Sequence, residues 1–199
     1  MQEADILKEF QAAQAILTGH FILSSGLHSP TYLQCARVLM EPARAERLCK
    51  ALAAKLAKTI DINKIDLVVA PAMGGVIVGY EMACQLGKPS IFCERDEGQF
   101  IFRRGFDMPA GAKVLVVEDV VTTGLSSKET FTTIEAAGGT VIAECSLIDR
   151  SNGVADLGVP YVALLKLDVP SYAPNDIPEA LQKIPAIKPG SRWLQQKTA

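Results

Sequence analysis

The sequence has few of the residues from which metal centres and disulfide scaffolds are built. It contains two histidines and five cysteines, and the cysteines form no Cys-x-x-Cys pair. A structural zinc site and a disulfide framework are therefore both disfavoured. Neither His20 nor His28 has a nearby thiol pair with which to bind a metal. Because most of the cysteines stand among apolar residues, we expect reduced thiols in a cytoplasmic protein.

Long apolar runs and an excess of basic residues are also missing. No segment approaches the roughly 20 apolar residues that span a bilayer, so we expect no membrane protein. The N-terminal stretch carries acids and no long apolar run, which is unlike a secretory signal. A formal net charge of −2 gives no general attraction to nucleic acid. The 199 residues are enough for one domain with a sizeable core.

Strand-like and helix-like segments alternate through the middle of the chain. Residues 3–18 show helical periodicity, and residues 19–40 suggest two short strands around a Gly/Ser/Pro turn. Pro42 suits the first turn of a helix that ends near Lys58. Further strands are predicted at 66–71, 90–95, 113–119, 140–149 and 161–167, with helices at 75–87 and 126–139. The alternation predicts a parallel sheet with helices on both faces, followed by a loop-rich tail that folds over the N-terminal segment.

One stretch, VLVVEDVVTTGLSS at residues 114–127, joins a buried strand to a helix. Residues 114–117 are apolar without alternation, as in strands that are covered on both faces. Residues 118–125 are then predicted as a loop, and Ser126 and Ser127 as candidate caps of the following helix. Ligands of open α/β sheets bind beyond the carboxyl ends of the strands, where this loop would lie.

The loop carries two kinds of chemistry. Residues 122–126 supply three hydroxyl side chains, a glycine that lets the backbone come close, and the N–H groups of a helix start, all of which suit a phosphate. Glu118 and Asp119 would repel a phosphate but can accept hydrogen bonds from sugar hydroxyls. The loop therefore predicts a site for a sugar phosphate. The alternative interpretation is a capped helix with two solvated acids.

Two other segments are predicted to reach the same edge of the sheet. Gly74 and Gly75 follow the strand at 66–71 and allow an anion to approach the start of the next helix. A plain tight turn is the alternative. Arg150 ends the strand at 140–149, where its guanidinium could hold a planar carboxylate through two hydrogen bonds. A surface salt bridge is the alternative for Arg150.

The stretch VVEDVVTTGLSS resembles the phosphoribosyl diphosphate (PRPP) signature of type I phosphoribosyltransferases, and it lacks the Gly-Lys-Ser/Thr of a Walker loop. The N-terminal LTGHFILSSGLHSPTYLQCARVL resembles the hood of the orotate phosphoribosyltransferase family. The resemblance runs from Leu17 to about Leu167. It implies an α/β type I phosphoribosyltransferase fold, with a central, mostly parallel sheet flanked by helices. A single domain would span residues 1–199, with a core at about 41–167 and a small hood from about 1–40 and 168–199.

The resemblance also implies an activity. The protein would transfer the 5-phosphoribosyl group from PRPP to orotate, giving orotidine 5′-monophosphate and diphosphate in pyrimidine biosynthesis. Mg²⁺ would be the cofactor, carried by substrate oxygens and water, with no direct protein ligand. Family members are homodimers in which the flap of one subunit covers the site of the other. No nucleic-acid or membrane partner is expected.

The family's binding residues can be carried over by position. Orotate would be bound by Tyr32, Leu33, Thr122 and Arg150. PRPP would be bound by Met73, Gly74, Arg95, Glu118, Asp119, Val120, Val121, Thr122, Thr123, Gly124, Leu125 and Ser126. The polar segment at 94–106 would be a mobile flap that closes over the diphosphate and excludes water, with Arg95, Arg103 and Arg104 as candidate catalytic residues. A solvated hairpin is the alternative for this segment.

The sequence departs from the family pattern at several positions. Ser24 and Gly74 stand where many members have Lys, and the flap lacks the usual catalytic His. This pattern is similar to a shorter-flap subgroup, and it leaves open which residue contacts the diphosphate and whether there is a general acid. Two other functions remain open: a purine phosphoribosyltransferase, and a non-enzymatic PRPP or nucleotide sensor of the same fold.

Overall fold

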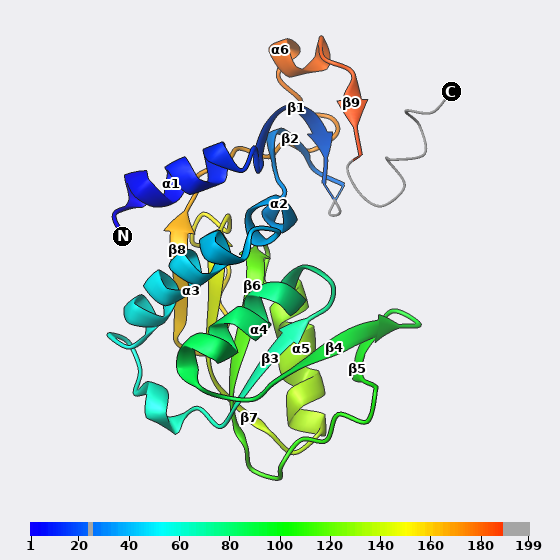
Figure 1. The fold of residues 1–199 in the computed structure, drawn as a ribbon. Helices are drawn as coiled ribbons and strands as arrows, with labels where there is room; N and C mark the ends of the chain where they lie inside the picture. Colours follow the sequence, from blue (N-terminus) through cyan, green and yellow to red (C-terminus); the bar gives the residue numbers. More distant parts are fainter. Residues whose placement is uncertain (24–25, 189–199) are drawn as a thin grey trace.

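The computed structural model describes residues 1–23 and 26–188, which form two β-sheets of unequal size (Figure 1). The helices are α1 (Glu3–Ala12), α2 (Cys35–Leu39), α3 (Pro42–Leu56), α4 (Gly74–Leu86), α5 (Leu125–Ala136) and α6 (Glu179–Gln182), with a 3-10 turn at Ile62–Lys64. The strands are β1 (Ile16–Ile22), β2 (His28–Leu33), β3 (Leu67–Pro71), β4 (Ser90–Asp96), β5 (Gln99–Phe102), β6 (Lys113–Val121), β7 (Thr140–Asp149), β8 (Tyr161–Lys166) and β9 (Ala186–Ile187).

The larger sheet has six strands in the order β5-β4-β3-β6-β7-β8. Every neighbouring pair is parallel except β4 and β5, which form an antiparallel hairpin. The predicted mostly parallel sheet is thereby confirmed. The chain builds outward from β3 to β4 on one side and from β6 to β8 on the other. The loops after β3 and β6 consequently flank the point where the strand order reverses, which is where open α/β sheets bind ligands.

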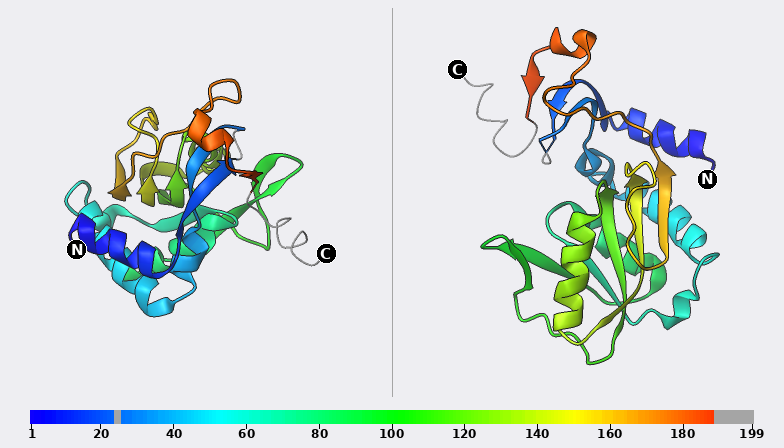
Figure 2. Two further views of the ribbon diagram at one scale, coloured as in Figure 1. Left: turned by 90° about the horizontal axis from the view of Figure 1, so that it is seen from above. Right: turned by 180° about the vertical axis from the view of Figure 1, so that it is seen from behind.

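The faces of this sheet are covered by different helices. Helices α3 and α4 lie on one face, and α5 lies on the other, as the view from behind shows (Figure 2). Strand β6 alternates accordingly: Leu115 and Val117 belong to the cluster around α3 and α4, while Val114 and Val116 belong to the cluster around α5. This alternation predicts which way each later residue of β6 points, because side chains change face at every step of a strand.

The smaller sheet, β2-β1-β9, forms the hood above the carboxyl edge of the larger sheet (Figure 1). The C-terminal segment does fold over the N-terminal one, since β9 pairs with β1 and Tyr172 forms a bridge with His28. Nδ1 of His20 lies 2.9 Å from the Ile184 carbonyl oxygen, which adds a side-chain contact to this association. Residues 189–199 of the predicted tail lie outside the described residues.

Two predictions about the first 40 residues are wrong in detail. The first helix ends at Ala12, and β1 already begins at Ile16. Gln14 has a positive φ of 50°, and the Ala15 N–H bonds the Phe10 carbonyl, which is the geometry of a Schellman stop. The sequence pattern missed this stop because glycine, the usual residue at such a position, is absent. Residues Cys35–Leu39 form α2 instead of continuing a strand.

Candidate active site

The predicted loop after β6 is shorter than the sequence suggested. Strand β6 continues to Val121, so Glu118 and Asp119 belong to the strand and not to the loop. Pairing with β7 maintains the strand that far: Val121 pairs with Asp149, and the Arg150 N–H donates to the Val121 carbonyl at 2.8 Å. The two acids therefore sit on a rigid element at the rim of the sheet.

Glu118 and Asp119 point to opposite faces of β6. Glu118 continues the α5 face and is only 6% exposed. Burial, then Asp119, then Glu144 raise the pKa of Glu118 well above its usual value. Asp119 continues the α4 face, where burial raises its pKa and backbone hydrogen bonds oppose the rise. A ligand at this rim thus meets one acid on each side of the strand end.

The turn from β6 into α5 is built around Gly124. Its φ of 76° is left-handed, and it is the N-cap of α5. Ser126 and Ser127, the predicted caps, instead lie inside the first turn of the helix. The Leu125 N–H donates to the Thr123 hydroxyl at 3.3 Å. The first N–H groups of a helix have no partner in a preceding turn, so this turn offers donors and a positive dipole to an anion.

The start of α4 approaches the same rim from the neighbouring strand. A Cβ placed on Gly74 would lie 2.7 Å from both carboxylate oxygens of Asp119. Any side chain here would therefore displace the acid. Gly74 therefore lets the start of α4 lie directly against the Asp119 carboxylate.

Arg150 lies beside this rim and is buried, with only 8% of its surface exposed. Its Nη2 donates to the Ser29 hydroxyl of the hood at 3.3 Å, and its Nε has no hydrogen-bond partner among the described residues. Burial lowers the pKa of Arg150, and Tyr32 acts in the opposite direction. Burial also raises the pKa of Tyr32, as does Asp119, while Arg150 lowers it. Tyr32 is therefore close enough to both charged groups to be influenced by them.

These side chains line one cavity of about 560 Å³ at the carboxyl edge of the sheet. Its walls come from β1, β2, β4, β6, the start of α5 and the residue after β7; they comprise Ile22, Leu23, Tyr32, Leu33, Arg95, Glu118, Asp119, Val120, Val121, Thr122, Thr123, Gly124, Leu125, Ser126, Ser127 and Arg150. The structure thus brings together every predicted orotate residue and most of the predicted PRPP residues. Ser24 lies outside the described residues.

Some predicted residues do not line this cavity, and some lining residues were not predicted. Met73, Gly74, Arg103 and Arg104 are absent from its walls. Ile22, Leu23 and Ser127 line it without having been predicted as ligand contacts. Ser127 was identified only as a helix cap, although an isolated acid in the apolar strand TVIAECSLID was a signal that some polar partner had to lie nearby.

The flap arginines are each paired with an acid. Arg95 donates to the Gly98 carbonyl at 2.6 Å and to Glu129 of α5 at 2.5 Å. Arg104 pairs with Glu94 at 2.7 Å, and Arg103 lies 3.8 Å from Asp96. Arg95 is the member of this set that lines the cavity. Ion pairs at such exposed positions stabilise by little, so a diphosphate could replace them.

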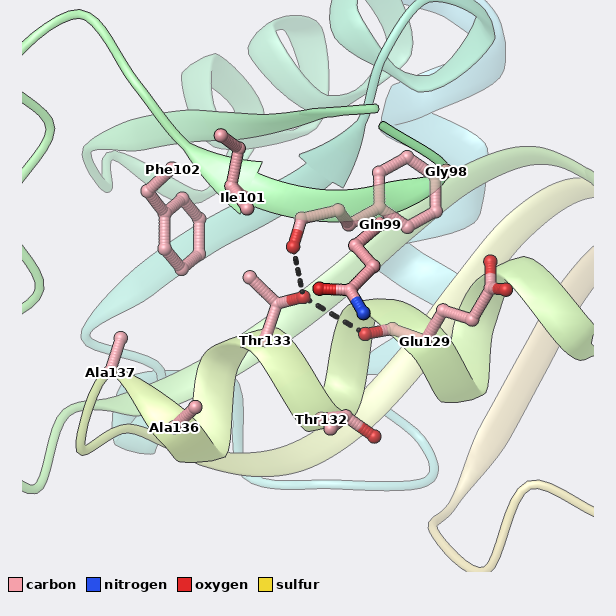
Figure 3. Close-up of a pocket in the computed structure, with 10 residues that line it drawn as sticks. Gly98, Gln99, Ile101, Phe102, Glu129, Thr132, Thr133, Ala136 and Ala137 are labelled. Carbon is pink, nitrogen blue, oxygen red and sulfur yellow. Dashed lines mark hydrogen bonds between the residues drawn. The ribbon is translucent and has the colours of Figure 1, made fainter. Parts of the chain in front are cut away.

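A second groove, of about 620 Å³, lies between β5 and α5 (Figure 3). It is formed by residues 98–102 and the adjoining face of α5. Thr133 joins its two walls, because its hydroxyl lies 3.0 Å from the carbonyl oxygens of both Phe100 and Glu129 (Figure 3). This groove contains none of the rim acids or Arg150, so it is separate from the candidate active site.

Known proteins resemble this chain along nearly its whole length. The family model for the phosphoribosyl transferase domain matches residues 39–168. Orotate phosphoribosyltransferase of Erythrobacter litoralis is 57% identical over 192 residues, which cover 96% of this chain and 99% of that protein. The corresponding protein of Rhizorhabdus wittichii is 58% identical over 192 residues, which cover 96% of this chain and 97% of the relative.

A solved structure agrees with the sequence relatives. Orotate phosphoribosyltransferase from Aeropyrum pernix matches with a TM-score of 0.70 and 28% identity, covering 81% of this chain and 93% of that one. The type I phosphoribosyltransferase fold predicted from the sequence is thereby confirmed. The chain belongs to the phosphoribosyltransferase family, and within it to the orotate phosphoribosyltransferases.

Proposed function

We propose that this chain, as a single domain over residues 1–199, transfers the 5-phosphoribosyl group of PRPP to orotate. The products are orotidine 5′-monophosphate and diphosphate, and the reaction serves pyrimidine nucleotide synthesis. One observation carries the assignment of the base: the buried Arg150, whose Nε lacks a partner among the described residues, beside the sugar-phosphate rim. The identity to orotate phosphoribosyltransferases favours this function over a purine enzyme or a non-enzymatic sensor.

Arg150 supplies the cation that would distinguish orotate from an uncharged base. Orotate carries a carboxylate, and a carboxylate entering a partly dry cavity needs a cation with matching geometry. The guanidinium offers a planar fork for two hydrogen bonds, and it is held through Ser29 at the junction of hood and core. We assign Tyr32 and Leu33 to the face of the orotate ring and Thr122 to its polar edge.

The remaining walls suit PRPP. The hydroxyls of residues 122–126 and the first turn of α5 would receive the 5′-phosphate, and Glu118 and Asp119 would accept hydrogen bonds from the ribose hydroxyls. Met73 and Gly74, at the start of α4, would lie nearest the diphosphate. Orotate is already an anion, so the protein's tasks are to align two anions and to exclude water while the C1–O bond breaks.

The donor set of the rim is compatible with Mg²⁺. The ion prefers oxygen ligands and retains water, and it is commonly held by one or two carboxylates together with substrate phosphates. Glu118 and Asp119 would hold the ribose and water, and the ion would be carried by substrate oxygens and water. The described residues contain no group of three or more His, Cys, Asp or Glu side chains placed to hold a metal. When bound, Mg²⁺ would neutralise charge on the diphosphate. We therefore propose that it enters with PRPP.

We also propose a cytoplasmic location. The five cysteines are free thiols, as is usual in a reducing compartment. Among the described residues, no helix is both long and apolar enough to span a bilayer.

The activity is tested by following the absorbance of orotate. Addition of Mg²⁺ and PRPP should consume orotate and produce orotidine 5′-monophosphate and diphosphate in equal amounts. Hypoxanthine and adenine, supplied in its place, should not be consumed at a comparable rate. Preference for either purine would overturn the orotate assignment and leave a generic phosphoribosyltransferase.

Arg150→Ala should lower kcat/KM for orotate by about 10²–10³, on the order of 2–4 kcal/mol, because the carboxylate would be left unpaired. Arg150→Lys should recover only part of the loss, since an ammonium group cannot form the two-point contact. Calorimetry should show that PRPP binding to the Ala variant is nearly unchanged. Arg47→Ala, on α3 and outside the cavity, is the control. An Ala variant that uses orotate as well as the parent would refute the role of Arg150.

Hydrogen exchange tests the flap. The amides of residues 94–106 that lie outside the β4–β5 ladder should exchange quickly in the free protein. The whole segment should become more protected with Mg-PRPP, because the diphosphate replaces Glu129 as the partner of Arg95. The same experiment with Arg95→Ala should show much weaker protection. Identical exchange of the parent with and without ligand would favour a solvated hairpin instead.

We further propose a homodimer whose contact includes one face of α4. Met73 is 82% exposed and Tyr80 66% exposed, and they lie on that face with Ile77 and Cys84 at helical spacing. Tyr80→Glu should therefore convert a dimer into a monomer in sedimentation experiments, whereas Lys50→Glu, on α3, should not. A parent protein that sediments as an active monomer would exclude the dimer.

A further inference from the structure

An acid lies in the interior of the sheet, outside the residues that the reaction requires. Glu144 is in the middle of β7 and has no exposed surface. It points to the α5 face, because it pairs in register with Val116 of the α5 cluster. One carboxyl oxygen, Oε2, has no hydrogen-bond partner among the described residues. A buried polar atom without a hydrogen-bond partner costs free energy.

The other oxygen of Glu144 is bound by the active-site turn. The Ser127 hydroxyl donates to Oε1 at 2.8 Å. Ser127 is in the first turn of α5, is 1% exposed, and lines the cavity. This hydrogen bond connects the turn assigned to the 5′-phosphate with the centre of the sheet. The connecting side chain, Glu144, has no exposed surface.

Glu144 also influences the rim acid on its own face. Glu118 pairs with Ser146, two residues beyond Glu144 along β7, so both acids lie on the α5 face. Glu144 contributes to the raised pKa of Glu118. The other titratable groups around Glu144 are Tyr161 and Cys145. Tyr161 on β8 pairs in register with Glu144, and Cys145 is the next residue of β7. From α5 the facing side chain is the neutral Ser127.

We propose that Glu144 is a positioning residue for PRPP: its carboxyl group holds Ser127 and the first turn of α5 in place, and its ionisation weakens phosphate binding. This proposal rests on the proposed function and concerns how the same site binds PRPP. An ionised Glu144 would place a buried negative charge directly behind a turn that must receive an anion.

The neutral form fits the environment of this side chain at physiological pH. Burial raises the pKa of Glu144 to about 8, and the Ser127 hydrogen bond opposes the rise. The group should therefore be protonated below pH 8 and become ionised above it. Because linkage is reciprocal, PRPP binding should favour protonated Glu144, and affinity for PRPP should fall as the pH rises through 8.

The test is the dissociation constant of Mg-PRPP, measured by calorimetry without orotate between pH 6.5 and 9.5. For the parent it should rise at least about threefold between pH 7 and pH 9. Glu144→Gln keeps the size and the acceptor for Ser127 but cannot ionise, so its affinity should match the parent at pH 7 and lose the alkaline rise. The exposed Glu135→Gln, on the α5 helix that carries Ser127, is the matched control and should keep the rise.

Ser127→Ala provides a second, independent arm. It should raise the dissociation constant about two- to tenfold at pH 7, the value of one lost hydrogen bond. It should also move the alkaline rise to higher pH, because the Ser127 bond favours the ionised carboxylate. Three results would each overturn the proposal. The parent could show no alkaline rise in its dissociation constant, or Glu144→Gln could keep that rise. Ser127→Ala could also have the same dissociation constants for Mg-PRPP as the parent. Because the readout needs no orotate, failure of the base assignment would be seen separately in the absorbance assay.

Discussion

Charged groups buried at the carboxyl edge of the sheet are the constraint on which the site depends. Glu118 and Arg150 are both almost fully buried, and Asp119 stands between the end of β6 and the start of α4. Ionised groups in such places cost free energy unless they are paired. Arg150 does not form an ion pair within the described residues, and its Nε is unpartnered. The free protein thus keeps a buried guanidinium that has no counter-ion among the described residues.

The rest of the fold allows this arrangement to persist. Apolar clusters on both faces of β6 fix the strand up to its end, and pairing with β7 extends that support to Val121 and Arg150. The hood contributes through Ser29, which receives the Arg150 hydrogen bond and also lies 3.1 Å from the Pro170 carbonyl. Arg150 is consequently connected through Ser29 to both the N-terminal and the C-terminal parts of the hood.

The sequence predicted the sheet and the identity of the rim residues because both depend on local signals. Uninterrupted apolar runs marked β3 and β6, and the acids near the end of β6 with the hydroxyls after it marked the predicted ligand edge. The sequence did not predict that the side chains of Glu118 and Asp119 point to opposite faces of the sheet. Their directions depend on where β6 ends and on its pairing with β7. Nor did it predict the contact between Ser127 and Glu144, which are separated by 17 positions and meet only when α5 packs on the sheet. The end of α1 was missed for a different reason: Gln14 adopts a conformation that usually signals glycine.

The account's central claim is that buried Arg150 selects a base that carries a carboxylate. Orotidine 5′-monophosphate and uridine 5′-monophosphate differ only in that group. Calorimetry of the two nucleotides with the parent protein therefore isolates the contribution of the carboxylate. A charge-assisted, two-point contact should make orotidine 5′-monophosphate bind about ten- to a hundredfold more tightly. Equal dissociation constants for the two nucleotides would contradict the account.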